Sequence, residues 1–195
     1  MSSPKLTLKN ITAICVDGRA PNEITQDLYT KILRYMRLKI EFGAIKLLSR
    51  EDPQVEGVQF FEIPRMSRTA YSAFCLKNLS EYVSTDFCLV FQSDGFVLNP
   101  EFWTDEFLSY DYIGAPWPSY LEFGPAEGQQ VGNGGFSLRS KRLLEVVKTI
   151  DYSETRYRPS NPPHPEIALG KDAEPPPTRT LSSANTSARS LKLRG

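Results

Sequence analysis

The chain has 195 residues, which suffices for one sizeable hydrophobic core and one domain. Its 23 Lys and Arg residues balance its 23 Asp and Glu residues, and this net charge of zero argues against nucleic acid and anionic membranes as partners. No apolar run approaches the about 20 residues that a membrane-spanning helix needs, and residues 1–10 lack the apolar core of a secretion signal, so we expect a cytoplasmic protein without a membrane span.

Strand and helix patterns alternate through the first half of the chain. Apolar runs predict strands, and the first of them ends in Asp17 and Gly18, which indicate a turn. Apolar residues at helical spacing, such as Leu28, Ile32 and Met36, predict amphipathic helices. The predicted elements of this half are strands over residues 10–18, 42–48 and 58–63 and helices over residues 24–38 and 67–83.

Residues 87–100, FCLVFQSDGFVLNP, form the most informative segment. It opens with an unbroken apolar run, typical of a strand buried on both faces. The run delivers Gln92, Ser93, Asp94 and Gly95 at its carboxyl end, where ligands bind in open α/β sheets. Beyond it we predict a short helix over 100–110, an extended piece over 113–117, a strand over 136–139 and a helix over 141–150.

Strands that alternate with helices predict an α/β fold, with one domain over residues 1–158 that has a mostly parallel sheet and helices on both faces. The composition changes after Tyr157, and residues 159–195 are rich in Pro, Ser and Thr. Such a segment buries too little apolar area to offset the entropy of ordering, so we predict a disordered tail. The basic side chains of residues 178–195 leave a nucleic-acid arm as the less favoured alternative.

The cysteines and the histidine exclude several kinds of site. Cys15, Cys75 and Cys88 fall in predicted strands and helices, which indicates buried free thiols in a reducing compartment. His164 is the only histidine, and the sequence has no C-x-x-C pair. A zinc site and a Ser-His or Cys-His nucleophile system are therefore not expected.

Asp94 is the first candidate for chemistry. A carboxylate at a strand end can ligate a divalent cation or orient a sugar hydroxyl. Asp94–Gly95 is equally typical of a plain turn. Gln92 and Ser93 add donors and acceptors suited to polar ligands.

The second candidate is the segment 131–140, VGNGGFSLRS, whose glycines surround Asn133 ahead of a predicted strand. We expect a loop with exposed backbone N–H groups and positive φ angles, which phosphate or sugar could approach. It lacks the Lys-Ser or Lys-Thr of a P-loop, and a strand follows it instead of the helix of a dinucleotide fingerprint. A tight hairpin turn remains the alternative.

Two further segments carry groups that could bind a nucleotide. Asp111 offers a carboxylate, and Trp117 offers a flat face for stacking on a base or sugar, although a buried Trp is commoner. Asp17 and Arg19 follow the first predicted strand, where Arg19 could pair with a diphosphate or form a surface ion pair.

Three segments in series carry a family resemblance: FQSDGFVLNP at residues 91–100, YDYIGAPW at 110–117 and VGNGGFSLRS at 131–140. In this order and spacing they resemble a little-characterised group of glycosyltransferase-like proteins with the nucleotide-sugar-binding GT-A fold. The resemblance implies a single Rossmann-like α/β domain. It also implies an enzyme of the hexosyltransferase type, which transfers sugar from a nucleotide-sugar to a hydroxyl of an unknown acceptor, whether glycan, lipid or protein.

The resemblance also implies roles for particular residues. Asp94 stands where related enzymes often carry Asp-x-Asp, which holds Mn²⁺ or Mg²⁺ against the diphosphate; only one acid remains here, so dependence on a divalent metal is open. Glu166 or Asp111 would act as general base toward the acceptor hydroxyl. The implied donor-binding residues are Asp17, Arg19, Gln92, Ser93, Gly95, Trp117, Asn133, Gly134 and Gly135.

The chain departs from the family pattern after His164-Pro165-Glu166. Related proteins continue there into an Asn-Glu-Asp-type motif that would supply the base, whereas Pro and Ser follow here. We therefore expect a truncated or frame-shifted C-terminus with Glu166 as the remnant. An active glycosyltransferase and a binding-only relic are the two leading hypotheses, and an unrelated α/β nucleotide-binding domain is the third.

Overall fold

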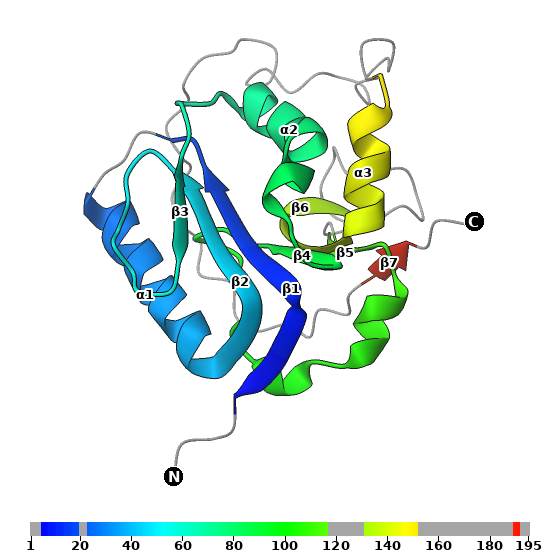
Figure 1. Cartoon of the computed structure of the whole chain (residues 1–195), viewed down its shortest axis with the longest axis horizontal. Coiled ribbons are helices and arrows are strands. Elements are labelled where there is room, and N and C mark those ends of the chain that lie inside the picture. Colours follow the sequence, from blue (N-terminus) through cyan, green and yellow to red (C-terminus); the bar gives the residue numbers. More distant parts are fainter. Residues whose placement is uncertain (1–4, 20–22, 117–130, 152–188, 192–195) are drawn as a thin grey trace.

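The computed structural model describes residues 5–19, 23–116, 131–151 and 189–191. They form a seven-stranded sheet in the order β3-β2-β1-β4-β6-β5-β7, flanked by helices (Figure 1). The strands are β1 Leu6–Asp17, β2 Ile40–Ser49, β3 Gln59–Glu62, β4 Phe87–Val90, β5 Tyr112–Pro116, β6 Val131–Ser140 and β7 Arg189–Leu191. The α-helices are α1 Glu23–Lys39, α2 Arg68–Lys77 and α3 Lys141–Thr149, and the 3₁₀ helices are η1 Leu79–Tyr82, η2 Pro100–Phe102 and η3 Asp105–Ser109.

Alternate residues of β1 build two separate hydrophobic cores, one on each face of the sheet. Ala13 and Cys15 pack in the core that α1 covers, while Ile14 and Val16 pack in the core below η1 and α3. Because successive side chains of a strand point to opposite faces, an apolar run such as that of β1 requires cover on both sides. The described part of the chain is therefore an α/β fold, as the sequence predicts.

Serine caps set the start of the two helices on the second face. The Ser67 hydroxyl accepts a hydrogen bond from the Ala70 amide at 3.2 Å, and the Ser140 hydroxyl accepts one from the Leu143 amide at 3.0 Å. Each bond satisfies an amide that the first turn leaves without an intrahelical partner. The segment predicted as one helix over residues 67–83 is divided at Asn78 into α2 and η1.

The prediction of a mostly parallel sheet is wrong, because the sheet is mixed. The β1–β2, β2–β3 and β1–β4 pairs are parallel, whereas the β4–β6, β5–β6 and β5–β7 pairs are antiparallel. Parallel neighbours need a crossover connection, usually a helix; α1 connects β1 to β2 and α2 lies between β3 and β4, whereas residues 50–58 connect β2 to β3 without a helix. No helix is described between β5 and β6, and β6 runs in the opposite direction between β4 and β5.

The glycine-rich segment belongs to a strand instead of preceding one. β6 begins at Val131, which pairs with Pro116, although the sequence predicts strand only from residue 136. The register jumps from the Gly114–Ser137 pair to the Ala115–Asn133 pair, so residues 134–136 form a bulge outside the ladder. The expected positive φ is absent at Gly134. Bulges of this kind are common beside active sites.

The structure also bears on the predicted free thiols, the expected absence of a membrane-spanning helix and the predicted disordered tail. All three cysteines are free and buried, as predicted, and burial raises the pKa of the Cys15 and Cys88 thiols to about 12. Within the described ranges, no helix is both long and apolar enough to cross a membrane. Of the segment predicted as a disordered tail, the structure describes only β7, which pairs with β5.

Candidate functional site

The candidate site lies at the carboxyl edge of the sheet, which we define as the edge where β1 and β4 end. After β1 the chain builds β2 and β3 on one side, then crosses back to place β4 on the other side of β1. The pair β1–β4 is thus the point where strand order reverses. In open α/β sheets, ligands bind in the crevice outside such a switch point.

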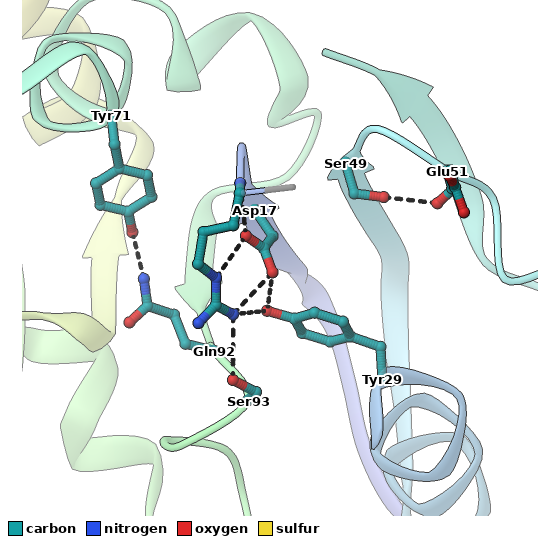
Figure 2. Close-up of polar contacts among 8 residues, drawn as sticks. Asp17, Tyr29, Ser49, Glu51, Tyr71, Gln92 and Ser93 are labelled. Carbon is teal, nitrogen blue, oxygen red and sulfur yellow. Dashed lines mark hydrogen bonds and ion pairs between the residues drawn. The ribbon is translucent and has the colours of Figure 1, made fainter. Parts of the chain in front are cut away.

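Asp17, the last residue of β1, is the centre of a polar cluster at this edge (Figure 2). Its Oδ1 accepts from the Arg19 amide at 3.0 Å and from Arg19 Nε at 2.9 Å. Its Oδ2 accepts from Arg19 Nη2 at 2.8 Å and from the Tyr29 hydroxyl at 2.7 Å. Both oxygens therefore have two donors each, and the Asp17 carboxylate serves to hold Arg19 and Tyr29 in place.

The environment fixes the charge of each member of this cluster. Burial alone would raise the pKa of Asp17, but the hydrogen bonds from Arg19 and Tyr29 outweigh it, so the pKa lies below its ordinary value. The hydrogen bond to Asp17 raises the pKa of Arg19, and burial raises that of Tyr29. At neutral pH the cluster is a carboxylate, a guanidinium and a neutral phenol.

Arg19 reaches from the end of β1 toward the end of β4. Its Nη2 lies 3.4 Å from the Ser93 hydroxyl and 3.1 Å from that of Tyr29. Its side chain is 64% exposed, whereas that of Asp17 is 8% exposed. Asp17 therefore presents a largely accessible guanidinium at the switch point, which suits recognition of phosphate or carboxylate.

Asp94 lies at the tip of a tight turn. The turn is closed by two backbone hydrogen bonds, from the Gln92 amide to the Gly95 carbonyl at 2.9 Å and from the Gly95 amide to the Gln92 carbonyl at 3.2 Å. Asp94 is exposed. The two alternatives raised by the sequence are thus compatible, because Asp94 is both a turn residue and an accessible carboxylate beside Ser93.

Gln92 is oriented from the opposite side by α2. Its Nε2 donates to the Tyr71 hydroxyl at 2.9 Å, and the two side chains point toward each other in Figure 2. Burial raises the pKa of Tyr71, which keeps the phenol neutral and able to donate. The turn that carries Asp94 is therefore in contact with α1 through Arg19 and Tyr29 and with α2 through Tyr71.

The bulge at the start of β6 reaches the same edge. Because Ser137 pairs with Val90, the last residue of β4, residues 134–136 extend beyond that strand toward the Asp94 turn. A Cβ on Gly95 would lie 3.0 Å from the Cβ of Phe136, so the turn and the bulge pack closely. The Gly134 carbonyl accepts from Ser137 Oγ and from Arg139 Nη2, each at 3.1 Å.

Asp111 lies away from the residues of the carboxyl edge. It precedes β5, and its backbone carbonyl accepts from the amide of Ser140, which pairs with Phe87 at the start of β4. From there to Gln92 the distance along the strand is roughly 15 Å. The Asp111 carboxylate accepts from Ser140 Oγ at 2.7 Å and from Arg142 Nη2 at 2.5 Å, so it anchors α3.

Two of the predicted site residues, Trp117 and Glu166, lie outside the described residues. The backbone of Asn133 pairs with Ala115, but its side chain is not described. Gly135 lies in the bulge beside Gly134.

Three residues of the edge are absent from the predicted site: Tyr29, Tyr71 and Arg139. The two tyrosines occupy apolar helix positions, and the segment 131–140 indicates a site through its glycines and not through Arg139. A signal exists for the tyrosines, since a buried phenol normally has a hydrogen-bond partner. The sequence does not say which partner it has.

The metal-binding capacity of this edge is small. The described residues hold no group of three or more His, Cys, Asp or Glu side chains arranged for a metal ion. The Asp17 oxygens accept hydrogen bonds from Arg19 and Tyr29. Asp94, in the turn, is then the accessible carboxylate of this edge. Mg²⁺ can bind through one or two carboxylates together with substrate phosphates, so Asp94 fits a site that the ligand completes.

A large apolar cavity of about 490 Å³ lies between the sheet and the segment that contains η2, and it adjoins the bulge through Phe136. Leu8, Phe96, Trp103 and Phe136 are among the residues that line it, and no described lining residue is charged. The groups able to perform chemistry are therefore at the carboxyl edge and not in this cavity.

The chain belongs to the family described as "Protein of unknown function (DUF5672)", whose model matches residues 57–174, more than half of the 195 residues. The matched part includes the Asp94 turn, Asp111, the glycine-rich bulge and Glu166. It does not include Asp17 and Arg19. No curated protein matches the chain.

Proposed function

We propose that the protein is a glycosyltransferase-like enzyme with a GT-A-like domain, which binds a nucleotide-sugar at the carboxyl edge and transfers the sugar to an acceptor hydroxyl. One observation carries the proposal. Three segments that are distant in the sequence, namely the end of β1, the Asp94 turn and the β6 bulge, meet at the switch point of the sheet. Nucleotides bind at this position in α/β sheets.

The residues of the edge have complementary roles in this proposal. Arg19 pairs with the diphosphate, and its charge offsets the negative charge that develops on the leaving group. Gln92 and Ser93 bind hydroxyls of the donor. Asp94 contacts the sugar or holds Mn²⁺ or Mg²⁺ together with the diphosphate, where the metal would act as a Lewis acid.

A binding-only relic is the second candidate, and the position of Asp111 favours it. Asp111 and Glu166 are the two candidate bases, and Asp111 is bound to Ser140 and Arg142 at the opposite end of β4. Glu166 then remains as the candidate base. In the relic, the donor binds at the same edge and no transfer follows.

A binding and turnover screen separates the candidates. The full chain is titrated with UDP- and GDP-sugars with and without Mn²⁺, by calorimetry, and then assayed for donor hydrolysis or transfer. The enzyme hypothesis predicts binding and turnover, the relic predicts binding alone, and the absence of binding by every donor would contradict both.

Asp94→Ala tests the turn directly, with Asp86→Ala as its matched control. Asp86 is also exposed and lies just before β4, at the end opposite Asp94. We expect Asp94→Ala to lower turnover at least about 100-fold without lowering the melting temperature, because the side chain makes no core contact. Asp86→Ala should leave turnover unchanged, and full activity of Asp94→Ala would remove Asp94 from the mechanism.

A further inference from the structure

Arg139 is a buried cation on β6 whose charge has no acidic partner in the described part of the chain. The residue is 8% exposed. Its described hydrogen-bond acceptors are neutral, the Ser137 hydroxyl at 3.0 Å from Nε and the Gly134 carbonyl at 3.1 Å from Nη2. The ring of Tyr112 adds a cation–π contact, with the guanidinium carbon 5.7 Å from its centroid.

Arg139 differs from Arg19 and Arg142 in having no carboxylate partner among the described residues. Arg19 is paired with Asp17 and Arg142 with Asp111. A buried guanidinium without an anion is costly, because desolvation is then offset only by neutral acceptors. Such a charge is favourable when an anionic ligand supplies the missing partner.

The guanidinium of Arg139 also keeps donors free for a ligand. Five N–H groups are available to an arginine, and Nη1 has no acceptor among the described residues. Nη1 is therefore the group of this guanidinium from which a ligand could accept a hydrogen bond.

The position of Arg139 connects it to the candidate site. Its Nη2 reaches Gly134, in the bulge that extends beyond the end of β4. Burial raises the pKa of Tyr71, and the charge of Arg139 partly offsets this effect, which places the guanidinium near the phenol that orients Gln92. Arg19 and Arg139 therefore approach the Gln92–Gly95 turn from β1 and from β6.

Gly134 maintains this position of the guanidinium. A Cβ at residue 134 would lie 2.9 Å from Arg139 Nη2, so a larger residue would displace the guanidinium. Glycine at this position thus leaves room for the observed arginine conformation, and its backbone does not adopt a positive φ.

We propose that Arg139 is an anion-binding residue that contacts phosphoryl oxygens of a diphosphate-bearing ligand at the carboxyl edge. The inference rests on the proposed function for the identity of the ligand as a nucleotide-sugar. It deepens that function by assigning a second cation, opposite Arg19, to the diphosphate. Bidentate hydrogen bonding from a guanidinium suits phosphate oxygens.

The test measures binding of inorganic pyrophosphate, UDP and uridine to the folded full chain by calorimetry. The variants are Arg139→Gln, Arg139→Lys and the control Arg142→Gln, which removes an arginine at the opposite edge. We expect Arg139→Gln to weaken the affinity for pyrophosphate and UDP roughly 10- to 100-fold, because one charge-assisted contact is lost, and to leave the affinity for uridine unchanged. Arg139→Lys should weaken the affinity for pyrophosphate and for UDP several-fold, and Arg142→Gln should weaken neither affinity.

Each outcome has a distinct meaning. Unchanged pyrophosphate and UDP affinity in Arg139→Gln overturns the inference while the proposed function stands. Equal losses for UDP and uridine, in Arg139→Gln or Arg139→Lys, indicate a purely structural role and also overturn it. Arg139-dependent pyrophosphate binding by a protein that binds no nucleotide-sugar supports the anion site and contradicts the proposed donor. A wild-type chain that binds none of the three probes contradicts both.

Discussion

Two buried aspartates, Asp17 and Asp111, form similar ion pairs at opposite ends of the sheet. Each accepts hydrogen bonds from Nε and Nη2 of one arginine, Arg19 or Arg142, and the arginine side chains are 64% and 60% exposed. Each also accepts from a hydroxyl, that of Tyr29 or Ser140. The chemistry of the two clusters is therefore nearly the same.

The difference is what each cluster holds. Asp111 orients the Ser140 hydroxyl that caps α3 and binds Arg142 in the first turn of that helix, so it attaches α3 to the sheet. Asp17 holds an arginine that continues across to Ser93 in the turn after the neighbouring strand β4. A buried Asp–Arg pair is thus no indication of a ligand site by itself, and its place relative to the strand ends decides the interpretation.

Replacement of Asp17 should produce the largest effect on stability. We expect Asp17→Ala to lower the free energy of unfolding by roughly 3 kcal/mol, because the Tyr29 hydroxyl, in a residue 4% exposed, loses its carboxylate acceptor. UDP affinity should also fall, since Arg19 loses its support. Urea unfolding and calorimetry measure the two effects, and an Asp17→Ala protein as stable as wild type would show that the cluster is not structural.

Asp111→Ala should destabilise the protein less and leave binding intact. We expect a loss of about 1–2 kcal/mol, because Ser140 still caps α3 but its hydroxyl has lost the Asp111 carboxylate. UDP affinity should equal that of wild type. The same urea and calorimetric measurements apply, and a loss of affinity with unchanged stability would move Asp111 into the site and reverse the comparison.

The position of the candidate site at the carboxyl edge could be predicted from the sequence, whereas several of the residues that contact it could not. The apolar runs that end at Asp17 and Phe91 locate two buried strands and place the polar residues after them at one edge, because both strands are parallel. The spacing of apolar residues does not say in which direction β6 runs. Neither the mixed sheet nor the position of Asp111 far from the carboxyl edge therefore follows from the sequence pattern. Tyr29 and Arg139 could not be assigned either, since their contacts depend on how α1 packs and on the bulge at residues 134–136.

The smallest predicted effect is the contribution of Asp17 to acid sensitivity. Its pKa is lowered in the folded state, so its stabilising contribution is present above the unfolded value of 3.8 and is lost as the pH falls through the folded pKa. A single group changes stability by at most about 1.4 kcal/mol per pH unit, and this slope should occur only below about pH 4.

Asp17→Asn isolates this contribution, because the asparagine has nearly the same shape and does not titrate. We expect the stability difference between wild type and Asp17→Asn to be constant near neutrality and to shrink below about pH 4, when the wild-type carboxylate takes up its proton. Asp86→Asn removes an exposed carboxylate with no described side-chain partner and controls for net charge. A difference that stays constant down to pH 2 would mean that the hydrogen bonds of Arg19 and Tyr29 do not favour the ionised carboxylate, and the cluster would then lose its basis for presenting Arg19.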